Sequence, residues 1–213
     1  YAVGIVVFAQ SGIGMAPWDV LSDGLSHTLG ISLGAAVLGV SVVLLAVNWR
    51  MGIRIGLGNI LDLVITGPIV DVIQAHHLIP AAQNLSQKLL MVACGLMVLN
   101  VATYFYVGAG LGAGPREGLM IGIVRRTGWS VRFTKSGLEL SAILAGTLLG
   151  GRFGVATVIV ALVTGPLMNL TFDLVHFDIK SVPQVYLDDQ LRILRERDSR
   201  PKPRETMGKH RDI

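Results

Sequence analysis

The sequence has one cysteine, few charged residues and only five histidines, and each shortage argues against a class of function. Cys94 lies inside a predicted membrane span, so neither a disulfide nor a zinc cluster is available. His76 and His77 are adjacent, a spacing that puts their side chains on different faces, and the other histidines are scattered. No Gly-x-Ser-x-Gly elbow, phosphate loop or dinucleotide fingerprint occurs. The sequence therefore predicts no enzyme activity, no cofactor and no metal site.

Apolar residues, by contrast, are abundant: 52% of the 213 residues are hydrophobic and only 15% are charged. Apolar runs follow one another with short polar breaks, which is typical of a membrane protein. The run from Tyr1 to Gly14 is apolar from its first residue and lacks an initiator Met, so we interpret it as a truncated sixth span. It shows neither the basic start nor the cleavage site of a signal peptide. A span needs about 20 mostly apolar residues, and the stretches that qualify are 31–48, 55–75, 87–108, 131–150 and 154–176.

The chain contains an internal duplication. The segment GIGMAPWDVL (12–21) recurs 98 positions later as GLGAGPREGL (110–119), and this register continues without a gap to a second shared motif. That motif is Thr-Gly-Pro, present at 66–68 and again at 164–166. Shared glycines are expected in a chain with 26 of them, but shared prolines and triplets are not. We assign a first repeat to 1–78, a second to 79–177 and a basic amphipathic tail to 178–213.

Each copy contains a span, a short segment that begins at a proline, a second span, a tight turn and a third span. Three crossings are an odd number, so the two copies enter the membrane from opposite sides if the proline segments do not cross it. Inverted repeats of this kind are common in transporters. The expected fold is an all-α membrane protein with six transmembrane helices, arranged as two inverted three-helix repeats, each with a short proline-started helix after its first span.

The basic residues give an independent indication of topology. Six crossings place the turn with Arg50 and Arg54, the stretch RRTGWSVRFTK (125–135) and the basic tail on one face, whereas the opposite face carries few basic residues. The positive-inside rule makes the first face cytoplasmic. We therefore expect a multi-pass protein of the bacterial inner membrane with both termini in the cytoplasm.

The two proline segments are candidate binding elements. Proline is tolerated in the first turn of a helix, and an acid two residues later favours the positive end of the helix dipole. A helix start alone explains this pattern. The alternative is that the glycines at 12, 14, 110 and 112 let the backbone approach a solute, while the two helix N-termini face an anionic group. The second interpretation selects Gly14, Pro17, Asp19, Gly112, Pro115 and Glu117.

The third spans add further polar candidates. Asn59, Asp62 and Thr66 are spaced three and four apart and share one helix face. A carboxylate inside an apolar run is costly unless it is paired, protonated or hydrated, so Asp62 is the best candidate for a contact with substrate, proton or cation. An interhelical hydrogen bond that fixes packing is the alternative. Thr164 is the equivalent of Thr66, whereas the equivalent of Asp62 is Val160, so the halves differ chemically.

The expected partners are a small solute and the bilayer. The tail segment PQVYLDDQLRILRERDS is typical of an amphipathic helix at the membrane surface, where basic residues contact anionic headgroups. Its acids are nearly as frequent as its bases, which argues against nucleic acid. The small-residue surface from Gly34 to Gly39 permits close helix packing and is compatible with a homo-oligomer.

Two stretches carry a resemblance to a known family. GIGMAPWDVLSDGLSHTLGIS followed by GAGPREGLM resembles the YczE/YitT-type family of bacterial integral membrane proteins, with a Gly-Pro-Trp-Asp-type and a Gly-Pro-Arg-acid-Gly-Leu-type motif. The resemblance covers Gly12 to about Asp173. Ala16 stands where the family has glycine, and Glu117 stands where it has aspartate. The resemblance implies a multi-span inner-membrane protein and is compatible with a small-solute transporter.

Two functions follow from these observations. The first is a secondary transporter or exporter of a small polar solute, with the cleft between the halves as its site. The second is a non-transporting membrane module for assembly or regulation, in which the duplication only solves a packing problem. A transporter requires a hydrated cavity beside the proline segments, whereas a module requires a dry core.

Overall fold

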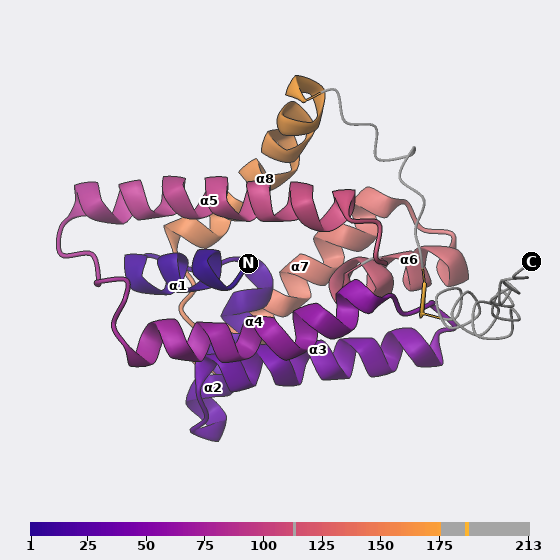
Figure 1. Ribbon diagram of the computed structural model, residues 1–213, viewed down its shortest axis with the longest axis horizontal. Coiled ribbons are helices and arrows are strands. Elements are labelled where there is room, and N and C mark those ends of the chain that lie inside the picture. The colour runs from indigo at the N-terminus through magenta and orange to yellow at the C-terminus, as the bar shows by residue number, and fades with distance from the viewer. Residues whose placement is uncertain (113, 176–185, 188–213) are drawn as a thin grey trace, which may run out of the picture.

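The computed structural model describes residues 1–112, 114–175 and 186–187, which form helices and loops without a strand. The expected all-α class is confirmed. The predicted tail lies outside the described residues except for Tyr186 and Leu187. The eight helices of the described part (Figure 1) are α1 (Ala2–Ser11), α2 (Pro17–Leu29), α3 (Leu33–Arg50), α4 (Leu57–Ala75), α5 (Leu85–Gly108), α6 (Pro115–Thr127), α7 (Val131–Leu148) and α8 (Val155–Leu174).

Local sequence signals explain where several helices begin and end. The side chains of Ser32 and Ser130 accept hydrogen bonds from backbone N–H groups in the first turns of α3 and α7. Proline occupies the first position of both α2 and α6, where its missing N–H costs nothing. Both of these helices end at a left-handed glycine, Gly30 or Gly128. Helices α3, α4, α5, α7 and α8 begin and end within two residues of the five predicted spans.

The helix bounds repeat at the spacing of 98 found in the sequence. Helix α2 corresponds residue for residue to α6, and α3 to α7, while α4 and α8 begin at equivalent positions. Helix α1 has 10 residues, whereas its equivalent α5 has 24. A positive φ angle favours glycine because a side chain would be strained there. The glycines with positive φ also form equivalent pairs: Gly12 and Gly110, Gly14 and Gly112, Gly30 and Gly128, and Gly52 and Gly150.

The two halves exchange equivalent contacts. The N–H of Ala156, at the start of α8, donates to the Ile13 carbonyl at 2.9 Å, and the N–H of Gly58, at the start of α4, donates to the Leu111 carbonyl at 3.0 Å. Helix α2 packs on α7, and its equivalent α6 packs on α3. Each Gly-x-Gly loop therefore lies against the third span of the other half.

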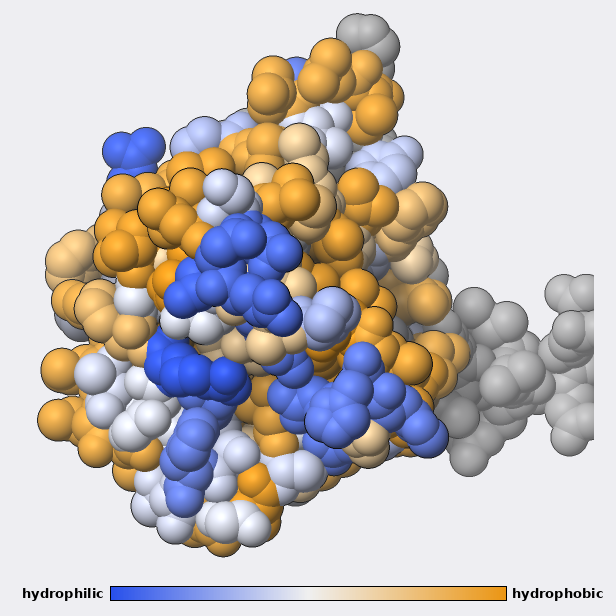
Figure 2. Space-filling view, turned by 90° about the vertical axis from the view of Figure 1, so that its left-hand side faces the viewer, coloured by the Kyte–Doolittle hydropathy of each residue, from blue (hydrophilic) through white to orange (hydrophobic). Residues whose placement is uncertain are grey.

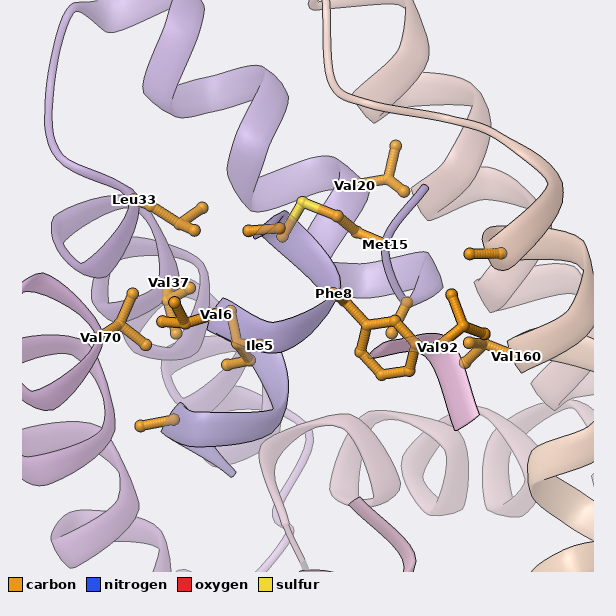
Figure 3. Close-up of a cluster of buried hydrophobic side chains, with 14 of the residues drawn as sticks. Ile5, Val6, Phe8, Met15, Val20, Leu33, Val37, Val70, Val92 and Val160 are labelled. Atoms are coloured by element: carbon orange, nitrogen blue, oxygen red, sulfur yellow. The ribbon is translucent and has the colours of Figure 1, made fainter. Parts of the chain in front are cut away.

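A buried apolar core surrounds α1. Phe8 and Val6 of α1 are fully buried and pack with Met15, Val20 and Val70 from the neighbouring segments (Figure 3). Helices α3, α4 and α5 run along the long axis of the molecule, and α1 lies between α4 and α5 (Figure 1). The core therefore holds the first helix inside the bundle.

Large apolar side chains also cover the outside of the bundle. Phe105 on α5, Leu148 on α7 and Leu162 on α8 are all exposed, as are many similar residues. Within the described residues, α3, α4 and α5 are long and apolar enough to cross a membrane. Cys94 is exposed on the surface of α5, so it faces outward from the bundle. Figure 2 shows hydrophilic residues gathered at one end of the molecule, with hydrophobic residues around them.

The two halves differ in how their last two spans pack. Gly34 of α3 and Gly67 of α4 lie in direct backbone contact, because a Cβ added at Gly67 would be 2.6 Å from the Gly34 carbonyl oxygen. The carboxylate of Asp71 accepts hydrogen bonds from the Gly34 N–H at 2.8 Å and the Ser32 hydroxyl at 2.6 Å. In the second half Arg132 replaces Gly34, and α8 runs away from α7 (Figure 1).

The crossing of α2 and α7 generates a stability prediction. A Cβ at Gly146 would lie 2.5 Å from backbone atoms of Val20 and Leu21, whereas Gly137, also in α7, has open space beside it. We expect Gly146→Ala to lower the stability of the purified protein by about 1–3 kcal/mol through overpacking. Gly137→Ala should leave it unchanged or raise it slightly, because alanine favours helix. Thermal unfolding in detergent measures both, and equal midpoints would contradict the close packing.

Candidate functional site

The two proline-started helices meet inside the bundle. Nη2 of Arg116, in the first turn of α6, donates to Oδ1 of Asp19, in the first turn of α2, at 3.0 Å. Asp19 is 1% exposed, and the guanidinium also lies over the Trp18 ring, 5.8 Å from its centroid. Pro17 and Pro115 are buried beside this contact. An ion pair therefore joins the starts of two helices from different halves.

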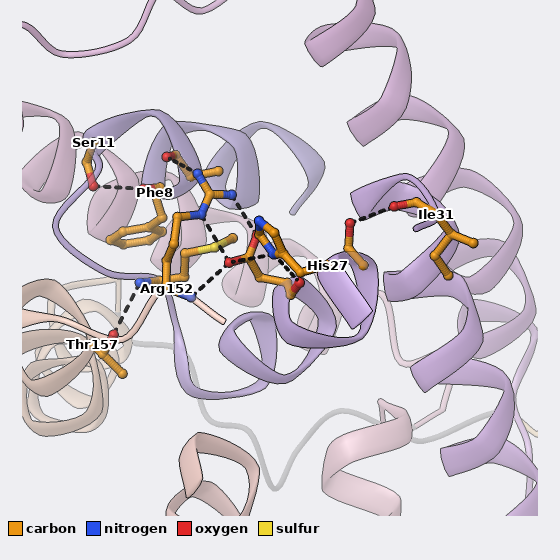
Figure 4. A network of polar contacts seen from close by, with 10 residues as sticks. Phe8, Ser11, His27, Ile31, Arg152 and Thr157 are labelled. Atoms are coloured by element: carbon orange, nitrogen blue, oxygen red, sulfur yellow. Dashed lines mark hydrogen bonds and ion pairs between the residues drawn. The ribbon is translucent and has the colours of Figure 1, made fainter. Parts of the chain in front are cut away.

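A second ion pair between the halves lies farther along α2 (Figure 4). Asp23 is 1% exposed, and Arg152 binds its two oxygens through Nη2 at 2.7 Å and Nε at 3.0 Å. The Arg152 backbone N–H adds a third hydrogen bond at 2.8 Å, and Nη1 donates to the Ala9 carbonyl at 2.9 Å. A carboxylate held by this many donors is fixed in place. This pair connects the α7–α8 turn to α1 and α2.

A cavity of about 240 Å³ lies between the first half of α4, the end of α5 and the loop that leads to α6. Its polar side chains are Asp62, Thr66 and Tyr106. The Thr66 hydroxyl donates to Asp62 Oδ1 at 2.6 Å. The remaining wall is formed by small and apolar residues, namely Gly58, Leu61, Ile65, Ala109 and Leu111. The cavity wall is therefore mainly apolar, although three of its lining residues carry polar groups.

Tyr106 contributes a buried hydroxyl without a hydrogen-bond partner in the described residues. Its ring packs edge to face on Tyr1, with the centroids 5.8 Å apart. The Tyr1 hydroxyl instead donates to Thr103 Oγ1 at 3.0 Å. A buried side-chain oxygen normally has a partner, and Tyr106 shares this exception with Asn48, Asn100 and Thr134 in the described residues.

The glycines and Asn59 lie against protein backbone. A Cβ at Gly14 would be 2.7 Å from Thr157 Oγ1, and a Cβ at Gly112 would be 2.7 Å from Asn59 Oδ1. Asn59 Oδ1 also accepts the Gly56 N–H at 3.1 Å. The close approach that these glycines permit is thus made to the opposite third span in this arrangement. Their contact with a solute stays a prediction.

The remaining predicted residues lie outside the cavity wall. Glu117 is exposed, and its carboxylate lies beside Gly114 at the start of α6, as expected for an acid at a helix N-terminus. The Thr164 hydroxyl donates to the Val160 carbonyl at 2.6 Å within α8. Its equivalent Thr66 bonds the Asp62 side chain. The structure therefore brings Asp62 and Thr66 together in the cavity and joins Asp19 to the second proline segment, whereas Thr164 bonds within its own helix.

Three residues of this region were missed by the sequence interpretation. Arg116 lies inside the second motif, and its position between two selected residues was an available signal. Arg152 lies on the face predicted to carry few basic residues, and nothing in the sequence indicated its ion pair with Asp23. Tyr106 lies in an apolar run, where an aromatic residue is unremarkable, and only the structure shows that it borders the cavity.

The fold and these polar elements define an all-helical membrane protein with a small, open cavity beside α4 and α5. The chain belongs to a family described as a family of unknown function (DUF6198), whose model matches residues 1–172. No solved structure matches the chain.

Three bacterial relatives extend this assignment. A Haemophilus influenzae protein called uncharacterised is 31% identical over 173 residues, covering 81% of this chain and 78% of its own. The Bacillus subtilis uncharacterised membrane protein YczE is 27% identical over 185 residues, covering 80% and 83%. The uncharacterised protein YyaS of the same species is 25% identical over 187 residues, covering 83% and 90%. The resemblance to the YczE type is confirmed.

The Asp23–Arg152 pair leads to a second stability prediction. Arg152→Gln removes the guanidinium from a buried carboxylate, but the Arg152 side chain is 42% exposed and its backbone N–H still binds Asp23, so we expect stability to fall by about 1–3 kcal/mol. Lys135→Gln is the matched control because Lys135 forms a looser pair with Glu139, 3.9 Å apart and half exposed, and should change stability by less than about 1 kcal/mol. Thermal unfolding compares the two variants. An Arg152→Gln protein as stable as the control would show that the pair is dispensable.

Proposed function

We propose that this protein is a secondary transporter or exporter of a small polar solute, built from two inverted repeats with six membrane crossings. The observation that carries the proposal is the meeting of α2 and α6, two helices that each rise about 20 Å over 13 residues. Both are too short to cross the hydrocarbon, and they begin side by side, joined by Asp19 and Arg116. Discontinuous helices that start near the middle of the membrane are a recurring feature of transporter sites.

The distribution of contacts along the bundle supports inverted halves. Arg126 donates to the Arg50 carbonyl at 3.5 Å, and Arg54 lies over the Tyr186 ring, so the end of α6 and Tyr186 lie near the turn between α3 and α4. At the other end, beyond the C-terminus of α4, Ala82 donates to the Gln10 carbonyl. Arg152 bonds the adjacent residue Ala9. Arg54 and Arg152 are equivalent residues. By these contacts, Arg54 lies near the start of α4 and Arg152 lies near the opposite end of the bundle. The positive-inside rule makes the Arg54 end cytoplasmic.

The cavity supports a transport role over a packing role alone. It lies beside the loop that precedes α6, and it contains a carboxylate in an apolar span, which is an expensive feature for a purely structural module. It does not border the first proline segment among the residues that form its wall. Alternating access requires that the two halves move relative to each other, so that the solute site opens to each side in turn.

The inverted topology can be tested with single cysteines. In a Cys94→Ala background, Arg50→Cys and Phe153→Cys both lie at exposed positions, near Arg54 and Arg152 respectively. We expect an impermeant maleimide to label Phe153→Cys in intact cells and Arg50→Cys only after the membrane is opened. Labelling of both cysteines from the same side would contradict inverted repeats.

Transport also predicts that the cavity is reached by water from both sides. In the same background, Thr66→Cys should react with a small impermeant methanethiosulfonate reagent in right-side-out and in inside-out vesicles. Leu140→Cys is the control, because Leu140 is 67% exposed on the outside of α7 and should face lipid. Protection of Thr66→Cys from both sides would indicate a dry core and favour the non-transporting module.

A further inference from the structure

We propose that the gap between α7 and α8 binds an anionic phospholipid, with its phosphate at the basic residues around the α6–α7 connection and its acyl chains against the exposed apolar side of α7. The α7–α8 gap is the space beside Arg132 and Ser136 of α7 and Gly165 of α8. This inference concerns the bilayer rather than a transported solute, so it does not depend on the transport function proposed above.

The gap exists because the second half lacks a helix contact that the first half makes. A Cβ added at Gly67 of α4 would lie 2.6 Å from the Gly34 carbonyl oxygen and 3.2 Å from Leu38 Cβ, both in α3. A Cβ added at the equivalent Gly165 of α8 would meet no atom of the described residues within 4 Å. Figure 1 likewise shows α8 running away from α7. The space that one helix fills in the first half is therefore open in the second.

The residues of α7 beside the gap differ from their equivalents in α3. Gly34 and Val37 of α3 are buried, whereas Arg132 and Lys135, at the equivalent positions of α7, are exposed. A Cβ at Gly34 would overlap the Gly67 carbonyl oxygen, so a contact of that kind cannot accommodate an arginine. The same two substitutions thus prevent close packing of α8 and place positive charge at the edge of the gap.

The charge of the α6–α7 connection selects an anion. No acid occurs between Glu117 and Glu139, and the segment between them has four basic residues, Arg125, Arg126, Arg132 and Lys135. Lys135 lies 3.9 Å from Glu139, but Arg125 and Arg132 form no ion pair among the described residues. The equivalent segment of the first half, 20–40, has neither arginine nor lysine. Basic residues at a membrane surface attract anionic lipid headgroups.

Aromatic and apolar side chains favour a phospholipid over a soluble phosphate. Trp129 and Phe133 are exposed, and their rings pack edge to face with the centroids 5.2 Å apart. Tryptophan is enriched at the level of the lipid headgroups. Leu140 and Leu144 are also exposed and follow Ser136 at a spacing of four, which places them on one side of α7. A headgroup at the α6–α7 connection therefore leaves its acyl chains beside an apolar surface.

The test is lipid binding to the purified full chain in a neutral detergent, measured by native mass spectrometry with dioleoylphosphatidylglycerol as the probe. Dioleoylphosphatidylcholine has the same chains without net charge, and glycerol 3-phosphate has the phosphate without chains. We expect phosphatidylglycerol alone to stay bound. The double variant Arg125→Gln/Arg132→Gln should weaken its binding about tenfold or more, because each basic residue near the headgroups contributes about fivefold. Lys88→Gln, at the other end of the bundle, should bind like the wild type (Figure 1).

The position of the acyl chains is tested with phosphatidylglycerol that carries a photoreactive diazirine in one chain. We expect cross-links to 131–148 and 155–174, and we expect the double variant to lose them. Equal binding of phosphatidylcholine, or unchanged binding of phosphatidylglycerol in the double variant, would overturn the site. Equal binding of glycerol 3-phosphate would show that the basic residues bind phosphate without the gap. Cross-links confined to α3, α4 and α5 would place the lipid elsewhere and also overturn the proposal.

Discussion

The structure depends on one constraint, that backbone polar groups in an apolar environment must find hydrogen-bond partners within the protein. The chain breaks its helices at the two Gly-x-Gly loops, which leaves carbonyl groups without the partners that a continuous helix provides. Ile13 and Leu111 recover partners from the first turns of α8 and α4. Those N–H groups are themselves the unsatisfied donors of a helix start. Each half therefore completes the hydrogen bonding of the other, which ties the two repeats into one folding unit.

The sequence predicted the helices better than the contacts between them. Helix limits depend on local signals, such as Ser32 and Ser130 at helix starts and Gly30 and Gly128 at helix ends. These signals recur at the spacing of 98 residues that separates the two repeats. Hydropathy then located the long helices, of which α3, α4 and α5 are long and apolar enough to cross a membrane. The polar contacts between halves depend on how helices far apart in the chain pack, and no local pattern records that.

The candidate site shows the same division. Asp62 and Thr66 share a helix face, so their proximity followed from helical spacing, and the structure joins them by a hydrogen bond. Tyr106 comes from another helix and was not distinguishable from a membrane-facing aromatic. Gly14 and Gly112 were predicted as points where the backbone approaches a solute, and the structure shows them close to the starts of α8 and α4. The sequence could not show this packing, because it joins segments that are far apart in the chain.

Four aspartates of the described residues differ in how the protein compensates their charge. Asp19 and Asp23 bind arginine side chains, and Asp71 binds the N–H of Gly34 in the first turn of α3. Each of these three therefore has a donor that is charged or lies at the positive end of a helix dipole. Asp62 accepts a hydrogen bond from the neutral hydroxyl of Thr66. Val160 fills the equivalent position in the second repeat without any charge, so the carboxylate at this position is a specific property of the first repeat. A duplicated scaffold can lose its symmetry in this way because the helix bounds of the two copies are kept while single side chains change.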